Sequence, residues 1–409
     1  MKPFRAFGLR LGHSFSSERV EREGVDLSTF TGRALMRLPA DAVMVAPPAA
    51  LWTPLAGLVA GRSLEGTLPG DPWARFILRM PSKWNGRLAV SGSPGLTGVH
   101  GCDLYWSDAL VKSGTAFACT DKGVRAVFDG DEAFVPQAPE NGIANWTGRM
   151  NALAELSRGE CRRVYGREPD KTYVVGVSNG GYLARKVLER DGGLFDGGVD
   201  VSGVHWAAKN NFMTQLPSAL KAADAQPPAK AALEAAGLPS DRGSEGILRL
   251  YRMIYWEASL ALCLGDLDPA YEGPLEEYQL SKRPAEVAER IQAIANTGEL
   301  KKPLLSLSGK LDCLATLRNH AETYRDSVKA KGGAALHRLY VVDKATHVDK
   351  DSEIFPGLDP LMPHAHRAFE LLARWVETGQ PAPGTLTADA AAPTWGAAAA
   401  PVGPTGNPR

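Results

Sequence analysis

A serine flanked by glycines lies directly after a short apolar run, and this spacing is suited to nucleophilic chemistry. The run Tyr173–Val175 predicts a strand, and it leads into Gly176-Val177-Ser178-Asn179-Gly180-Gly181. A serine on so tight a strand-to-helix turn has a strained backbone, and only very small residues two before and two after it let the turn close. The helix formers of residues 182–190 place Ser178 at a helix N-terminus, where the partial charge is positive. The segment predicts a nucleophile elbow, although a glycine-rich turn can also be purely architectural or bind phosphate.

A serine is a poor nucleophile at neutral pH, so it needs a base, and the base needs a carboxylate that fixes its tautomer. The apolar run 303–307 predicts a strand, and Asp312 follows it on the next loop. The run 337–342 predicts a later strand, which is followed by His347. Acid then histidine, each after a late strand, is the chain order that accompanies such a serine in one large class of folds. We therefore predict Ser178 as nucleophile, His347 as base and Asp312 as the orienting acid.

The other histidines and acids compete less well for these roles. His205 follows the predicted strand 198–202 and could line a substrate pocket, with simple packing as the alternative. Asp349 is too close to His347 in sequence to replace Asp312 easily. The remaining candidates have structural or exposed positions, or lie within a helical insertion: His320, His337, His364, His366 and Asp266.

Acyl transfer also needs donors aimed at the developing oxyanion, each worth roughly 3 to 4 kcal/mol when well placed. The backbone N–H of Asn179 is the first predicted donor. The second is expected from the loop after the predicted strand 87–91, where Ser93 is the first choice and Gly92 the next. Pro94 has no N–H and is excluded. A purely structural turn is the alternative for this loop.

The composition is that of an ordinary globular protein, with 409 residues, 44% hydrophobic and 22% charged. The formal net charge is zero, so no global field favours nucleic acid or an anionic membrane surface. No stretch approaches the roughly 18 apolar residues of a membrane span. Residues 1–5 are not followed by the apolar segment of an export signal, which favours the cytoplasm, or secretion if a leader has been removed. The oligomeric state is left open.

The five cysteines have no metal-ligand spacing, and their odd number leaves at least one thiol unpaired within the chain. We expect most of them to be small buried hydrophobes. The alternative is a disulfide between Cys263 and Cys313. No metal or organic cofactor is predicted.

Strands alternating with amphipathic helices from Trp73 onward predict an α/β fold with a mostly parallel central sheet and helices on both faces. Residues 1–205 form the first part of this core, with antiparallel strands and loops near the N-terminus. Residues 206–302 show helical spacing without a convincing strand, and predict a helical cap. Its aromatic cluster, Tyr251, Tyr255 and Trp256, forms either the cap core or a substrate wall. Residues 303–379 complete the core, and 380–409 predict a flexible tail.

The predicted strands cover residues 74–80, 87–91, 115–120, 172–177, 198–202, 304–308 and 336–342. The predicted core helices cover residues 103–112, 145–165, 182–190, 320–331 and 364–377.

These motifs resemble a known family. The run Gly176–Gly181, the later Phe195-Asp196-Gly197-Gly198-Val199 and the strand end Thr120-Asp121-Lys122-Gly123 are similar to the tannase and feruloyl esterase branch of the α/β-hydrolases, over residues 73–377. The string Val177–Gly181 also resembles 3-hydroxybutyrate oligomer hydrolases, which cleave short polyesters. Tannase-type enzymes typically place bridged cysteines beside the nucleophile and the histidine, whereas this chain has Val177 and Thr346 there. The resemblance implies the hydrolase fold and an ester substrate, and leaves the acyl group open.

The sequence therefore predicts a serine carboxylester hydrolase that works through an acyl-enzyme. The expected substrate is a small or oligomeric ester of an aromatic acid or a hydroxy acid, with Trp146 and Trp206 as candidate contacts. An acyltransferase or a peptidase would use the same triad. A non-catalytic binding protein would keep the fold without a working triad.

Overall fold

The computed structural model describes residues 19–28, 48, 58–95, 98–124, 142–190, 193–225, 229–240 and 243–388. Its centre is one ten-stranded sheet with the order β1-β2-β3-β5-β4-β6-β7-β8-β9-β10. The strands are β1 Val20–Asp26, β2 Ala60–Leu68, β3 Asp71–Pro81, β4 Arg87–Gly92, β5 Ala116–Thr120, β6 Lys171–Val177, β7 Gly197–Val201, β8 Leu304–Gly309, β9 His337–Val342 and β10 Leu386–Ala388.

The pairing is parallel from β5 through β4, β6, β7, β8 and β9 to β10, and antiparallel from β1 through β2 and β3 to β5. The predicted mostly parallel α/β sheet is confirmed. The expectation of parallel pairing from Trp73 onward is wrong for β3. Only a short turn with no crossover helix joins β3 to β4, so the two strands run in opposite directions, and β3 is antiparallel to β5, which runs parallel to β4. The central strands are buried on both faces, which explains their nearly continuous apolar sequences.

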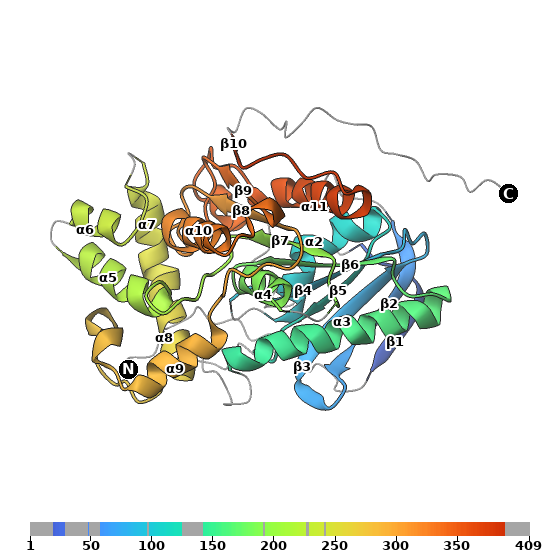
Figure 1. Ribbon diagram of the computed structural model, residues 1–409, viewed down its shortest axis with the longest axis horizontal. Coiled ribbons are helices and arrows are strands. Elements are labelled where there is room, and N and C mark those ends of the chain that lie inside the picture. The colour runs from blue at the N-terminus through green and yellow to red at the C-terminus, as the bar shows by residue number, and fades with distance from the viewer. Residues whose placement is uncertain are drawn as a thin grey trace.

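Helices cover both faces of this sheet (Figure 1). The α-helices of the described residues are α2 Val99–Lys112, α3 Ile143–Tyr165, α4 Asn179–Leu188, α5 Phe212–Asp224, α6 Lys230–Ala235, α7 Glu245–Tyr251, α8 Glu257–Leu267, α9 Ala285–Ile294, α10 Thr323–Ala330 and α11 Leu361–Thr378, with π-helical segments at Arg252–Trp256 and Leu317–Glu322. Apolar side chains of α2 and α11 pack on one face. Those of α3, α4 and α10 pack on the other face, in one apolar cluster that also includes the insertion between β7 and β8.

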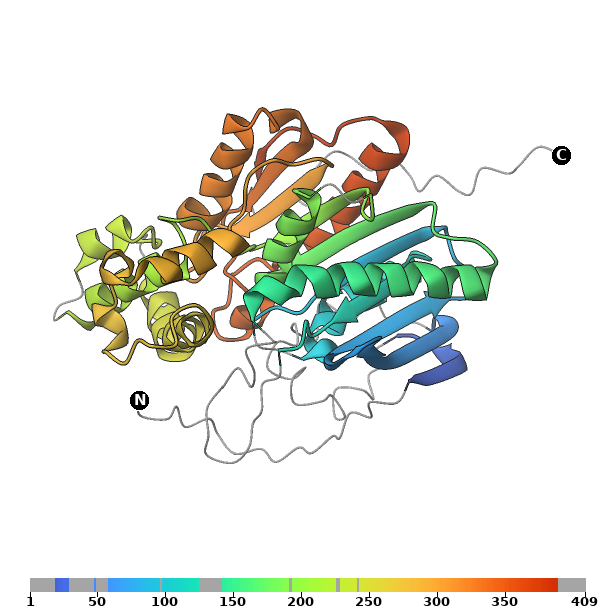
Figure 2. The ribbon, with the colours of Figure 1, turned by 60° about the horizontal axis from the view of Figure 1, so that its bottom comes forward.

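That insertion is helical in its described part, and α5 to α9 gather at one side of the molecule, on the left in Figures 1 and 2. The predicted helical character of residues 206–302 is confirmed there, whereas its treatment as a separate domain stays a prediction. Tyr251 and Trp256 are fully buried, and the Trp256 Nε1–H donates to Cys313 O at 2.8 Å. These two rings belong to the common apolar core, as the first alternative for the aromatic cluster predicted.

Two expectations about the chain are corrected. The segment predicted as a flexible tail from residue 380 begins with ordered structure, because Leu386–Ala388 adds β10 beside β9 and Pro383 O accepts a hydrogen bond from Tyr340 OH at 2.9 Å. Residues 389–409 lie outside the described residues. The Cys263–Cys313 disulfide is wrong, since all five cysteines are free and buried.

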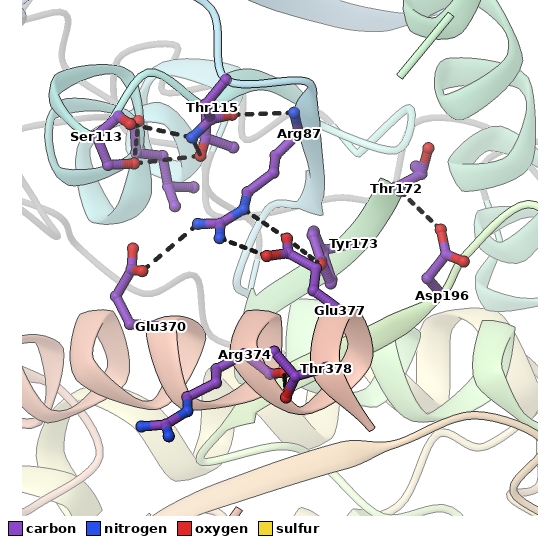
Figure 3. A network of polar contacts seen from close by, with 12 residues as sticks. Arg87, Ser113, Thr115, Thr172, Tyr173, Asp196, Glu370, Arg374, Glu377 and Thr378 are labelled. Atoms are coloured by element: carbon purple, nitrogen blue, oxygen red, sulfur yellow. Dashed lines mark hydrogen bonds and ion pairs between the residues drawn. The ribbon is translucent and has the colours of Figure 1, made fainter. Parts of the chain in front are cut away.

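The amino ends of β4 and β6 are fastened to α11 by a partly exposed polar network (Figure 3). The Arg87 guanidinium donates two hydrogen bonds of 2.7 Å to Glu377, one to each carboxylate oxygen. Tyr173 OH donates to the same carboxylate at 3.0 Å. A forked arginine–carboxylate pair fixes orientation as well as distance. This clamp holds the outer helix at the edge of the sheet opposite to the one where the predicted site residues lie.

Candidate active site

Strained backbone is concentrated where the central strands end. Of the residues that the structure describes, three that are not glycine have positive φ: Lys122 at 54°, Ser178 at 58° and Ser202 at 47°. They follow β5, β6 and β7, which are close neighbours at the carboxyl edge of the sheet. Backbone of this kind costs of order 1 to 3 kcal/mol per residue and persists at functional sites when the surroundings enforce it. The geometry around Ser178 is the one predicted for a nucleophile elbow.

The glycines of the elbow are explained by close backbone contacts. A Cβ on Gly176 would lie 2.2 Å from the carbonyl carbon and oxygen of Gly180. A Cβ on Gly180 would lie 2.2 Å from Gly92 O, at the end of β4. The Ser178 N–H donates to Val201 O at 2.9 Å, and its carbonyl oxygen accepts from the Val204 N–H at 3.2 Å. The serine is thus locked between β4, β7 and α4, which begins one residue later.

Asp312 and His347, the predicted acid and base, contact each other directly. His347 Nδ1 lies 2.8 Å from Asp312 Oδ2, and the other carboxylate oxygen accepts from the Leu314 N–H at 2.8 Å. Both side chains are buried, with 4% of the His347 side chain and none of Asp312 exposed. A carboxylate in this position selects the tautomer with the proton on Nδ1, which leaves Nε2 free to accept a proton.

The loops that hold this pair are packed against each other. The Leu311 N–H donates to Ala345 O at 2.9 Å, and a Cβ on Gly309 would lie 2.3 Å from the same oxygen. β8 and β9 are adjacent parallel strands, so both loops leave the same edge of the sheet from which Ser178 projects. Two residues 35 positions apart therefore meet, because the sheet brings their strands together. The transfer of a proton from Ser178 to His347 stays a prediction.

The predicted oxyanion donors differ in what the structure offers. Asn179 is the first residue of α4, and N–H groups of a first helical turn have no carbonyl partner in their own helix. The Ser93 N–H donates to Thr120 O at 2.9 Å, because the β4–β5 ladder continues one residue past Gly92. Ser93 as a backbone donor is therefore corrected, since this amide is already engaged. Gly92 pairs with Thr120 and Gly176 as the last residue of β4, and its role stays a prediction.

The three predicted pocket residues are all buried. Trp146 lies under the Lys122 ammonium, with 4.7 Å between Nζ and the ring centroid. The Trp206 N–H donates to Asn296 Oδ1 at 3.2 Å. The His205 ring packs 5.7 Å from that of Tyr324, and burial together with the positive charge of Arg185 lowers the pKa of His205 to about 3. This environment fits the packing alternative for His205, while substrate contact by the three side chains stays a prediction.

The competing histidines have the structural positions expected of them. His320 Nε2 lies 2.7 Å from Gln215 Oε1, and its Nδ1 accepts from the His205 N–H at 2.9 Å. His337 Nε2 lies 2.9 Å from Ser306 Oγ, and His366 Nε2 lies 2.9 Å from Tyr105 O. Burial lowers the pKa of His364, which begins the second turn of α11. Asp266, in α8, accepts from the Ile143 N–H at 2.8 Å.

Sequence reasoning missed three groups that support the site. Tyr251 OH donates to Asp351 Oδ2 and accepts from the His347 N–H at 3.1 Å, so the helical insertion contacts the loop that carries His347. Asp349 accepts from the backbone N–H groups at the start of α11, at 2.6 and 3.0 Å, and so caps that helix. Lys122 reaches the loop after β4. Of these three groups only Asp349 had a signal in the sequence, because an acid ahead of a helix can cap it. The separation of twelve positions between Asp349 and the start of α11 made this signal hard to recognise.

Comparisons with known proteins show which families and folds this chain resembles. The family model described as "Tannase and feruloyl esterase" matches residues 62–240, which confirms the predicted resemblance. The chain is 26% identical over 156 residues to mono(2-hydroxyethyl) terephthalate hydrolase of Piscinibacter sakaiensis, and this match covers 35% of the chain and 25% of that protein. The chain thus spans only a quarter of the length of this curated relative.

Solved structures share the fold over most of the chain. Feruloyl esterase B from Aspergillus oryzae superposes with a TM-score of 0.60 at 14% identity, covering 89% of this chain and 87% of that one. An esterase from the same organism has a TM-score of 0.54 at 14% identity, covering 89% and 86%. The predicted α/β-hydrolase fold is confirmed. Among the described helices, none is long and apolar enough to cross a bilayer.

Proposed function

We propose that this chain is a carboxylic ester hydrolase that acts through an acyl-enzyme on Ser178. The observation that carries the proposal is the buried His347–Asp312 pair, 2.8 Å apart, at the same sheet edge as a serine with a φ of 58°. The match of residues 62–240 to the tannase and feruloyl esterase model supports the ester hydrolase class. The relatives with solved structures, a feruloyl esterase and an esterase, are named for the same class.

The reaction follows from the positions of these groups. Ser178 Oγ attacks the ester carbonyl carbon while His347 Nε2 takes its proton, and Asp312 stabilises the imidazolium that forms. The N–H of Asn179 donates to the carbonyl oxygen as it becomes negative. The bond to the alcohol then breaks, and His347 returns the proton to the leaving oxygen. Water repeats the sequence, releases the acid and restores Ser178. This chemistry needs no metal ion or organic cofactor.

The proposed substrate is a small or oligomeric ester of an aromatic acid, with hydroxy acid oligomers as the second candidate. The aromatic acid is favoured because relatives are named for feruloyl and terephthalate esters. Aromatic side chains bury about 150 to 250 Å² each in protein cores, and the aryl ring of a substrate would gain a similar stabilisation from burial in an apolar site. The second candidate, hydroxy acid oligomers, is based on the resemblance of the string Val177–Gly181 to 3-hydroxybutyrate oligomer hydrolases.

A panel of esters tests both the proposed hydrolase activity and the proposed substrate class. Feruloyl, galloyl and terephthaloyl esters, hydroxybutyrate oligomers and the matching aryl amides are incubated with the protein, and released acid is quantified by chromatography. We expect hydrolysis of at least one aryl ester in buffer without an added alcohol, and loss of that activity in Ser178→Ala. Acid release that requires an acceptor alcohol would indicate an acyltransferase, and faster cleavage of the amides would indicate a peptidase. Full activity in Ser178→Ala would overturn the assignment.

A further inference from the structure

Lys122 is a buried amine beside the predicted oxyanion loop. It lies two residues after β5, has a φ of 54° and is fully buried. Its Nζ donates to Ser93 Oγ at 2.7 Å and to Gly95 O at 3.1 Å. Its own carbonyl oxygen accepts from Arg149 Nη1 at 2.8 Å. A strained backbone and a desolvated amine at one position are costly, so their presence together at the sheet edge indicates a role there.

The strand register places Lys122 and Ser178 on either side of this loop. Thr120, Gly92 and Gly176 form one row across β5, β4 and β6. Lys122 and Ser178 each lie two residues beyond that row. The loop that starts with Ser93 leaves β4 between them. Because Gly92 O contacts the backbone at Gly180, the start of this loop also lies against the first turn of α4.

The hydroxyl of Ser93 is the one hydrogen-bond donor of this residue that remains available to a substrate. Its backbone N–H already donates to Thr120 O. A lysine ammonium has three donors and no acceptor, so Ser93 Oγ must accept from it and its hydroxyl proton is left for another acceptor. A neutral amine has a lone pair and could take that proton instead. The charge on Lys122 therefore decides in which direction the Ser93 hydroxyl donates.

We propose that Lys122 is a positioning residue for the oxyanion site, which holds Ser93 Oγ as an acceptor so that the Ser93 hydroxyl donates to the oxyanion beside the Asn179 N–H. This inference deepens the proposed ester hydrolysis and rests on it. Donors in a water-excluded site are worth more than in water, which agrees with the full burial of Ser93 and Lys122.

The titration of Lys122 supports this role. Burial lowers the pKa of Lys122 to about 7, although the negative charge of Asp121 acts in the opposite direction. The Asp121 carboxylate is itself bonded to Arg75 Nε at 2.7 Å. The groups that face the amine from the packed elements are Ser93 and Gly95 of the β4 loop, Cys102 of α2, Trp146 of α3, and Asp121, whereas Arg149 of α3 contacts the Lys122 carbonyl oxygen.

A double-mutant cycle tests the proposal on whichever ester the panel identifies. We expect Ser93→Ala to lower kcat roughly 100-fold, the loss typical of one oxyanion donor, with little change in KM. Lys122→Met should lower kcat roughly 10- to 100-fold in the wild-type background and by less than about threefold in the Ser93→Ala background, because Lys122 acts through Ser93. The matched control is Lys186→Met, which removes another buried lysine that donates to a backbone oxygen, Ala295 O.

The pH profile separates positioning from a structural role. As pH rises through the pKa of Lys122 the amine becomes neutral, so wild-type kcat should fall on the alkaline side, whereas Lys122→Met should lack this fall. Losses that multiply in the double variant, or an unchanged alkaline limb in Lys122→Met, would overturn the proposal. If Lys122→Met does not fold, as judged by thermal melting, Lys122→Gln is measured in its place. Wild-type hydrolysis with a fully active Lys122→Met refutes only this inference, whereas absent wild-type hydrolysis refutes the proposed function.

Discussion

Replacing Asp312 with asparagine would test the acid–base pair at the level of a single proton. In the folded protein Oδ1 accepts from the Leu314 N–H and Oδ2 from His347 Nδ1, both at 2.8 Å. Asparagine has the same shape but only one oxygen. If that oxygen keeps the Leu314 bond, the amide NH₂ faces Nδ1 and forces the proton onto Nε2. His347 then cannot accept the proton of Ser178.

The magnitude follows from the alternative orientation of the new side chain. Turning the amide restores the correct tautomer but points its NH₂ at the buried Leu314 N–H, which costs about 1 to 3 kcal/mol for an unsatisfied group. The charged hydrogen bond to the imidazolium is lost in addition, at about 1.5 to 3 kcal/mol. The sum of about 2.5 to 6 kcal/mol corresponds to a loss of roughly 10² to 10⁴ in kcat.

The assay is steady-state hydrolysis of the best ester from the panel by Asp312→Asn, with KM measured separately. The control is Asp266→Asn, which alters a mostly buried carboxylate of α8 that accepts from the Ile143 N–H and should leave kcat within about twofold. Melting curves confirm that both variants are folded. An Asp312→Asn variant that retained more than about a tenth of the wild-type kcat would refute the tautomer argument.

Four further predictions follow from contacts already described. Gly180→Ala should destabilise the fold by about 1 to 3 kcal/mol in urea unfolding and lower kcat, because its Cβ would meet Gly92 O at 2.2 Å, and unchanged stability would contradict the packing. Excess dithiothreitol should leave the melting temperature unchanged, since the cysteines are free; a fall would reveal a disulfide. Tyr251→Phe should lower kcat by roughly tenfold, because the buried His347 N–H loses its acceptor, and wild-type kinetics would show that this contact does not position the loop. Burial raises the pKa of Asp349 from 3.8 to about 6, so the folded protein binds this proton more tightly than the unfolded chain, and the stability contributed by the protonated form is lost as pH rises from about 4 to 6. Between pH 4 and pH 7 the free energy of unfolding of Asp349→Asn, measured in urea, should therefore rise by roughly 3 kcal/mol relative to that of the wild type. A difference between the two proteins that does not change with pH would refute this pKa.

The positions of the three proposed catalytic residues relative to the strands could be predicted, because local sequence rules constrain them. Glycines at fixed offsets identify the elbow around Ser178, since any larger residue clashes with neighbouring backbone. Asp312 and His347 follow apolar runs that are long enough to be buried strands. The boundaries of the central strands were accurate to within a few residues for the same reason.

The supporting contacts were not predictable, because they join segments far apart in the chain. Tyr251 and Asp351 are 100 residues apart, and no local pattern indicates that they meet. The Ser93 amide was misassigned because the sequence does not show that the β4–β5 ladder extends one residue beyond the strand. Residues 380–388 have the composition of a tail because Ala, Pro and Gly precede β10, yet Leu386–Ala388 pairs with β9 at the edge of the sheet, which composition does not reveal.

The clamp of Arg87 on Glu377 has a practical consequence for attaching the protein to a support. It lies at the amino edge of the sheet, and the seven residues of β6 separate that edge from Ser178 by about 23 Å at roughly 3.3 Å per residue. Arg167 and Asp170, just ahead of β6, have about half or more of their side chains exposed, at 49% and 64%. A cysteine introduced there would tether the enzyme with its reactive edge turned to the medium. Such an orientation would leave a polymeric or insoluble ester free to approach.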